Sequence, residues 1–280
     1  MKKITTLPFF LVLMLFAAFD TAANLLIYPV RVSFDDTERT AELSLTNTSQ
    51  TTNTYRLSWR ENIALPDGGY EVVKKEDAGG LPLASPMLRF APRQVTLKPG
   101  ERQTIKVALR RPRDLAAGEY RSHLLFKALP NPKDEERKKA GTSMQINMTV
   151  SFAVPVSVQQ GNYDSTVALE ETTLAYYPDK ESGSVSVRMS RQGLHSSSGD
   201  ISAFWTPDGG KEKLIAKRAD FNFWAELDEV NTQLVWAKAD FEPQDGQLRI
   251  VYEGVRDFQD KVYIDETVRF KKSDIDVISQ

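Results

Sequence analysis

Every second residue between Met144 and Val154 is apolar, and this alternation constrains the fold more than any other feature of the chain. The segment 144–155 reads Met-Gln-Ile-Asn-Met-Thr-Val-Ser-Phe-Ala-Val-Pro. Successive side chains of a β-strand point to opposite faces, so the pattern predicts a strand with one hydrophobic face and one small or polar face. The stretch is about twice as long as a typical strand of five or six residues. A strand of this length can extend beyond the core of its own domain, which leaves part of its apolar row for a partner.

The alternation alone leaves two interpretations open. The segment is either an ordinary amphipathic strand that covers its own sandwich or an edge strand that pairs with another chain. The preceding residues, 130–142, read Pro-Asn-Pro-Lys-Asp-Glu-Glu-Arg-Lys-Lys-Ala-Gly-Thr and contain no apolar residue larger than Ala or Pro. Such a composition does not bury enough surface to offset its ordering entropy, which predicts a mobile loop. A mobile loop that leads into a long hydrophobic strand favours the second interpretation.

The N-terminal segment has the organisation of a secretory signal peptide. Two lysines at positions 2 and 3 precede an apolar run at 7–18, and the small residues Thr21-Ala22-Ala23 follow. Because the apolar run is short for a bilayer span, we expect a cleaved signal peptide, residues 1–23, and not a membrane anchor. No Cys follows the signal, which excludes a lipid-anchored lipoprotein. We expect the exported chain to begin at Asn24.

Composition and motifs narrow the classes of function. The length of 280 residues suggests about two domains. The formal net charge of −2 gives no reason to expect a nucleic-acid partner. The chain has no Cys, and its two histidines, His123 and His195, have no neighbours at metal-ligand spacing, so we predict neither a metal nor a cofactor. Without a phosphate loop, a nucleophile elbow or a His–Glu helix motif, we predict no catalytic residues and no enzyme.

The pattern of strands and turns predicts an all-β chain of two immunoglobulin-like β-sandwich domains. Turn residues such as Pro66-Asp67-Gly68-Gly69 recur at Pro207-Asp208-Gly209-Gly210. We expect an N-terminal domain at 24–155 and a C-terminal domain at 156–280, with a Trp on the third strand of each (Trp59 and Trp205). The candidate strands of the first domain are 24–34, 40–46, 54–59, 87–97, 103–109, 120–128 and 144–154; those of the second are 166–176, 185–189, 200–205, 213–216, 232–237, 248–252 and 262–270.

Taken together, these segments resemble the periplasmic chaperones of chaperone–usher pilus assembly. The resemblance is carried by Ile27–Phe34, by Ser85–Val107 with its Phe-Ala-Pro-Arg and Leu-Lys-Pro-Gly-Glu runs, by Gly118–His123, and by the alternating strand that ends at Pro155. It implies two immunoglobulin-like domains in an L or boomerang arrangement and a location in the periplasm. It also implies that the chain binds pilin subunits, lends them a strand, and delivers them to an outer-membrane usher. This donor-strand complementation is a form of β-augmentation.

The resemblance also implies which residues bind the subunit. Met144, Ile146, Met148 and Val150 are expected to enter the subunit groove, and Phe152 and Val154 form the core end of the same strand. Arg31 matches by position the family's Arg, which binds the C-terminal carboxylate of the subunit in the cleft between the domains. Alignment on Pro155 puts Val150 where the family usually has a second anchor, a Lys, and no Lys occurs between Met144 and Pro155. The chain therefore resembles a divergent branch with a different anchor.

Two other classes of function are weighed against this one. A structural or adhesive component of a surface fibre would carry a donor peptide before its first strand, whereas strand residues begin here at about Asn24. A secreted carbohydrate-processing enzyme would need a pair of carboxylates in a cleft, which a sequence does not display. We rank the fibre component second and the enzyme last.

Overall fold

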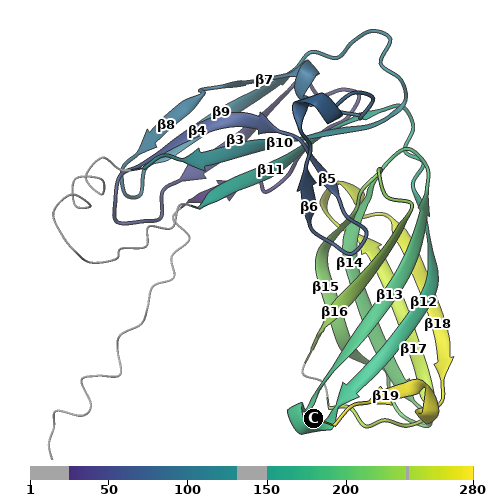
Figure 1. Cartoon of the computed structure of the whole chain (residues 1–280). Coiled ribbons are helices and arrows are strands. Elements are labelled where there is room, and N and C mark those ends of the chain that lie inside the picture. Colours follow the sequence, from purple (N-terminus) through teal and green to yellow (C-terminus); the bar gives the residue numbers. More distant parts are fainter. Residues whose placement is uncertain (1–24, 131–149, 238–239, 280) are drawn as a thin grey trace, which may run out of the picture.

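The protein consists of two β-sandwiches that meet at an angle and give the molecule an L shape (Figure 1). The structure is a computed structural model that describes residues 25–130, 150–237 and 240–279. Within these ranges the helices are short 3₁₀ turns, and strands form both domains. The predicted all-β class with two immunoglobulin-like sandwiches is confirmed. The expected signal peptide, residues 1–23, lies outside the described residues.

The first sandwich packs a four-stranded sheet against a five-stranded sheet. The first sheet has the order β1-β3-β9-β7 and the second has the order β2-β11-β10-β4-β8. Alternate side chains of both sheets form one core around residues such as Phe34, Leu43, Ile105, Leu124 and Phe126. The strands are β1 (Leu26–Tyr28), β2 (Val32–Phe34), β3 (Thr40–Thr46), β4 (Asn53–Arg60), β7 (Leu88–Ala91), β8 (Gln94–Leu97), β9 (Arg102–Leu109), β10 (Gly118–Ala128) and β11 (Ser151–Gln160).

Strand β11 continues past the boundary that the sequence places at Pro155. Val154, Val156 and Val158 all point into the core of the first sandwich, so the first domain includes the strand as far as Gln160. Proline lacks an N–H group and is confined in sheets to edges and strand ends. Pro155 meets this condition because β2 pairs with β11 only at Val156–Val158. The alternation of apolar residues continues past Pro155 to Val158, so the proline does not mark the end of the strand.

A hairpin of the first domain reaches the second domain. It is formed by β5 (Asn62–Ala64) and β6 (Tyr70–Val72), which enclose the predicted turn at 66–69. Figure 1 shows the hairpin leaving the first sandwich and lying against the second. Its Ala64 is buried in the core of the second domain. Two 3₁₀ turns, η2 (Lys75–Asp77) and η3 (Ser85–Met87), follow the hairpin.

The second sandwich is a single eight-stranded sheet that folds into two layers. Its order is β18-β17-β14-β15-β16-β13-β12-β19. Strands β15 and β16 share only two residue pairs, Ala216 with Trp236 and Lys217 with Val235, so the sheet opens between them. The strands are β12 (Thr166–Tyr177), β13 (Ser182–Gln192), β14 (Ser197–Pro207), β15 (Lys213–Phe223), β16 (Glu229–Trp236), β17 (Gly246–Gly254), β18 (Val262–Phe270) and β19 (Ile275–Val277), with the 3₁₀ turns η4 (Pro178–Lys180), η5 (Arg256–Phe258) and η6 (Lys272–Asp274).

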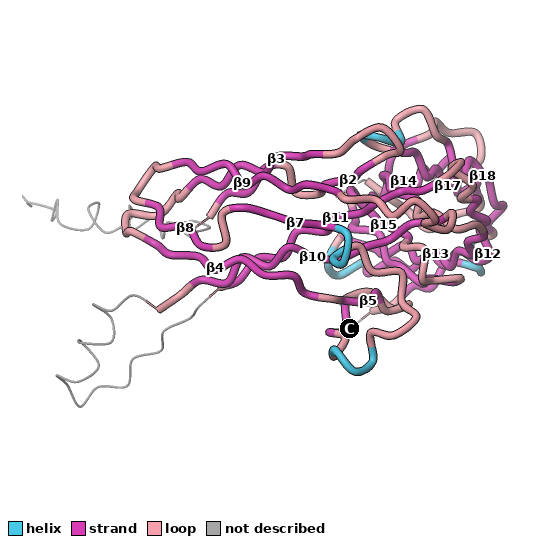
Figure 2. Tube along the Cα trace, turned by 90° about the horizontal axis from the view of Figure 1, so that it is seen from above, coloured by secondary structure: helices cyan, strands magenta, loops and turns pink. Residues whose placement is uncertain are grey.

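The two tryptophans that the sequence places on third strands lie on β4 (Trp59) and β14 (Trp205) and differ in burial. Trp205 is almost fully buried at the centre of the second core. Trp59 is only partly buried and stacks edge-on against Phe90 at the margin of the first core. Figure 2 shows the first sandwich extending away from the second, with β2, β10 and β11 running toward the junction of the two domains.

Candidate functional site

From Val150 into β11, alternate apolar side chains become progressively more buried. Val150 exposes 44% of its surface, Phe152 packs partly against the first core, and Val154 is buried. Phe152 and Val154 thus form the core end of the strand, as predicted. Three of the expected subunit-binding residues, Met144, Ile146 and Met148, lie outside the described residues.

One edge of β11 is open along its first half. β10 pairs with β11 on one side from Lys127–Ser151 to Gly118–Gln160. On the other side, within the described residues, β2 pairs only with Val156–Val158. The backbone of Ser151–Pro155 therefore presents an unpaired strand edge. Such an edge is a template for the addition of an extended strand from another chain.

A second apolar row lies on β1 and the residues that follow it. Leu26, Tyr28 and Val30 expose 58%, 71% and 58% of their surfaces, while the alternate residues Leu25 and Ile27 are buried. Contiguous exposed hydrophobic surface is characteristic of interaction sites. This row precedes Arg31 directly in the chain.

Arg31 lies at the junction of the two domains and contacts the second domain. Its Nη1 donates a hydrogen bond of 2.8 Å to Oδ1 of Asn222 on β15. Its guanidinium carbon lies 5.1 Å from the ring centroid of Trp224 and 5.7 Å from that of Phe258. The Nε and Nη2 atoms are buried and have no hydrogen-bond partner among the described residues. No carboxylate within the described part of the chain forms an ion pair with Arg31.

A second arginine, Arg121 on β10, is buried beside Arg31. It forms an ion pair with Glu226, and its guanidinium carbon lies 3.9 Å from the ring centroid of Trp224. Burial lowers the pKa of Arg121, while the charge of Glu226 acts in the opposite direction. Trp224 in turn donates from Nε1 to the hydroxyl of Tyr70 on the hairpin, at 3.0 Å. The sequence analysis missed this cluster, although Arg121 lies in the Gly118–His123 segment that carries part of the family resemblance.

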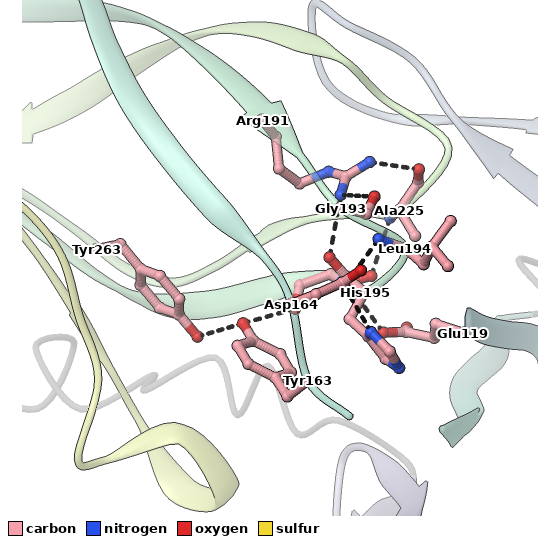
Figure 3. Close-up of polar contacts among 10 residues, drawn as sticks. Glu119, Tyr163, Asp164, Arg191, Gly193, Leu194, His195, Ala225 and Tyr263 are labelled. Atoms are coloured by element: carbon pink, nitrogen blue, oxygen red, sulfur yellow. Dashed lines mark hydrogen bonds and ion pairs between the residues drawn. The ribbon is translucent and has the colours of Figure 1, made fainter. Parts of the chain in front are cut away.

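Glu119 joins β10 of the first domain to the second domain (Figure 3). One carboxylate oxygen accepts a hydrogen bond from the backbone N–H of Ser196 at 3.0 Å, and the other accepts from the Ser157 hydroxyl at 3.1 Å. The backbone N–H of Glu119 also donates to the carbonyl of Leu194 at 3.0 Å. Because these groups are buried, the bonds fix the position of the loop before β14 against the end of β10.

The loop before β14 is held from within the second domain by Asp164 and Arg191 (Figure 3). Asp164 lies 2.7 Å from Nδ1 of His195 and accepts from the N–H of Leu194 at 2.8 Å. Burial by itself raises the pKa of Asp164, but the hydrogen bonds from His195 and Leu194 bring the net pKa below its usual value. The guanidinium of Arg191 donates to four backbone carbonyls, those of Gly193, His195, Ala225 and Leu227.

The Asp164–His195 pair has the carboxylate–imidazole contact of a catalytic triad, but no described hydroxyl or thiol is bonded to the His195 ring as its third member. His195 is buried, and its Nε2 has no hydrogen-bond partner among the described residues. His123 is also buried, on β10, and its ring stacks edge-on against Tyr70. Both histidines are therefore buried among neighbouring side chains of their own domains.

The described residues contain no group of three or more His, Cys, Asp or Glu side chains arranged to hold a metal ion. They also contain no helix that is long and apolar enough to cross a membrane.

Comparison with known proteins gives matches among solved structures only. No protein-family model and no curated protein sequence matches the chain. A structure of the CsuC–CsuE chaperone–tip adhesion subunit complex from archaic chaperone–usher pili of Acinetobacter baumannii is similar, with 13% identity, a TM-score of 0.44, and coverage of 91% of this chain and 100% of that chain. The CupB2 chaperone of Pseudomonas aeruginosa has 14% identity and a TM-score of 0.43, with coverage of 88% of this chain and 100% of that one.

A third similar structure is the Salmonella enterica SafA pilin in complex with the SafB chaperone. It has 11% identity and a TM-score of 0.45, with coverage of 88% of this chain and 96% of that chain. These solved structures belong to the class of protein that the sequence resembles. Because the identities and TM-scores are low, the function proposed below rests on the residues of the chain itself.

Proposed function

We propose that the chain is a divergent periplasmic chaperone that binds and stabilises pilin subunits by donor-strand complementation and delivers them to an outer-membrane usher. The observation that carries the proposal is the unpaired edge of β11 at Ser151–Pro155, together with the apolar row that runs in register from Val150 into the core. Main-chain hydrogen bonds at such an edge supply affinity, and alternate side chains supply specificity.

The size of the apolar row is sufficient for tight binding. Met144, Ile146, Met148 and Val150 would enter successive pockets of a subunit groove. Burying one such side chain contributes roughly 1.5–3 kcal/mol, so the four together contribute on the order of 6–12 kcal/mol before the cost of ordering the strand. The two methionines suit binding to several related subunits, because their side chains are flexible and polarisable.

Arg31 is the proposed anchor for the carboxylate at the C-terminus of the subunit. It carries a positive charge without an ion-pair partner in the described chain, and its planar guanidinium matches a carboxylate in two-point geometry. The exposed row Leu26, Tyr28 and Val30 lies just before it in the chain and would extend the contact along β1.

The alternative, a component of the fibre itself, is less well supported. A subunit that receives a donor strand has an incomplete sandwich with an open groove. Here β11 pairs with β10 over ten residue positions, and its valines fill the core of the first sandwich. The first domain therefore has its last strand in place.

Purification of the tagged chain from periplasm tests the proposal. A smaller pilin should co-purify with the wild-type chain and should be lost from Ile146→Asp, because that change would bury an unpaired charge in the subunit groove. Exposed Thr96 on β8, changed to Asp, serves as a matched control and should retain the pilin. Absence of any pilin from the wild-type preparation would contradict the proposed function.

A further inference from the structure

Asn222 of the second domain engages Nη1 of the Arg31 guanidinium, a group that a bound ligand of Arg31 would contact. Asn222 Oδ1 accepts from Nη1 at 2.8 Å, and the rings of Trp224 and Phe258 lie against the guanidinium. The other two nitrogens, Nε and Nη2, are buried without partners. The guanidinium is therefore held against the second domain, and an anion does not reach its nitrogens without a change in this contact.

Asn222 is oriented for this role by its own neighbours. Its Nδ2 donates to the carbonyl of Asp220 at 3.0 Å, and its Oδ1 also accepts from the Ser198 hydroxyl at 2.9 Å. Asp220 has a left-handed backbone with φ of 52°, and it lies where the pairing of β14 and β15 shifts register between Gly199 and Ile201. The bond from Nδ2 to the Asp220 carbonyl beside this bulge leaves the amide oxygen of Asn222 facing Arg31.

We propose that Asn222 is an internal competitor that holds Arg31 against the second domain, and that a carboxylate must displace it to bind. The proposal rests on the proposed function in taking a carboxylate as the ligand of Arg31. An amide oxygen is a neutral acceptor, whereas a carboxylate forms charge-assisted bonds that are roughly twice as strong. A carboxylate therefore displaces Asn222, while neutral peptide groups do not, and the contact selects for a charged chain terminus.

Displacement of Asn222 releases only one of the contacts between the domains. The ion pair of Arg121 with Glu226 and the hydrogen bonds of Glu119 remain. The L shape therefore persists, and the change is confined to the side chains around Arg31. A stronger Arg31–Asn222 hydrogen bond then means a lower affinity of Arg31 for a carboxylate.

Two substitutions of Asn222 have opposite expected effects. Asn222→Ala removes the competing oxygen and should free Arg31. Asn222→Asp keeps an oxygen at the position of Oδ1 and adds a charge, so it should hold Arg31 more tightly. The probes are N-acetylglycine, which ends in a carboxylate, and its uncharged amide. Binding is followed by the NMR signal of the Arg31 Nε–H group, assigned by its absence from Arg31→Ala, and circular dichroism checks the fold of each variant.

The expected result is that Asn222→Ala binds N-acetylglycine roughly tenfold more tightly than the wild-type chain, and that Asn222→Asp binds it roughly tenfold more weakly. The amide should not bind any of the three proteins at Arg31. Equal affinities of the wild type and Asn222→Ala, or tighter binding by Asn222→Asp, would overturn the inference. If the titrations behave as expected but no pilin co-purifies with the wild-type chain, the proposed function fails and the role of Asn222 stands.

Discussion

The guanidinium of Arg121, on β10 of the first domain, stacks on the ring of Trp224 in the second domain at 3.9 Å from the ring centroid. The same ring contacts Arg31 and donates a hydrogen bond to Tyr70 of the β5–β6 hairpin. Trp224 thus joins three separate segments of the first domain to the second. These contacts connect the two domains in a chain that has no Cys and therefore no disulfide between them.

The ion pair of Arg121 with Glu226 should contribute strongly to stability. Removing one partner of a buried pair leaves an uncompensated charge, so Glu226→Ala should lower the free energy of unfolding by about 3 kcal/mol. Glu229→Ala is a matched control, because Glu229 pairs with Arg188 on the exposed surface, and its loss should change the free energy of unfolding far less. Urea denaturation of both variants measures the difference. Equal losses would contradict the assignment of Arg121–Glu226 as a buried pair.

Burial of His123 predicts a loss of stability in mild acid. Burial, followed by the charges of Arg121 and Arg60, lowers the pKa of His123 from 6.5 to about 4. The unfolded chain therefore binds a proton between these two pH values when the folded chain does not, so stability falls as the pH drops from 6.5 to 4. The full loss is on the order of 3 kcal/mol.

His123→Asn should remove this part of the pH dependence. The two proteins are compared by chemical denaturation at several pH values within the window. The free energy of unfolding of the wild type should fall more steeply with acid than that of the variant. Parallel pH profiles would show that His123 is not a source of the acid sensitivity.

Ile146 and Val156 have the same parity in the sequence, and under the proposed function they should respond differently to substitution by Asp. Ile146→Asp should weaken subunit binding at least a hundredfold, because a buried unpaired charge costs several kcal/mol, while the melting temperature should change little. Val156→Asp should unfold the first domain, since Val156 is fully buried in its core. A large drop in the melting temperature of Ile146→Asp would place Ile146 in the core and contradict its role in binding.

If the chain acts as proposed, Arg31→Ala should abolish stabilisation of the subunit while the chain itself stays folded. The substitution removes one hydrogen bond to Asn222 and the contacts with two rings, so the free energy of unfolding should fall by only about 1–2 kcal/mol. The level of pilin in the periplasm is the readout, with Arg218→Ala on the exposed surface of β15 as a control. Normal pilin levels with Arg31→Ala would show that the carboxylate is bound elsewhere.

Strands with clear alternation were predictable from the sequence almost to the residue. Thr40–Thr46 and Val262–Phe270 have the predicted bounds, and in each strand the buried side chains lie on one face. The strand expected over 24–34 instead divides at Pro29 into β1 and β2, which belong to different sheets. The alternation of apolar and polar residues continues through Pro29, so the sequence pattern does not show that the strand is divided there.

The contacts between the two domains could not be predicted from the sequence. Arg31 and Asn222 are 191 positions apart, and Arg121 and Glu226 are 105 positions apart. Pairings at such separations follow from the docking of two finished domains, and no local pattern encodes them. The β5–β6 hairpin was missed because each of its strands has only three residues, too few for a period to appear.

Amide hydrogen exchange of residues 144–155, with and without a bound pilin, tests the central claim most directly. If β11 lends its open edge to the subunit, amides in this segment should exchange much more slowly in the complex. Amides of β8, at the far edge of the same sheet, should exchange at the same rate in both states. Unchanged exchange at 144–155 in a stable complex would contradict donor-strand complementation by β11.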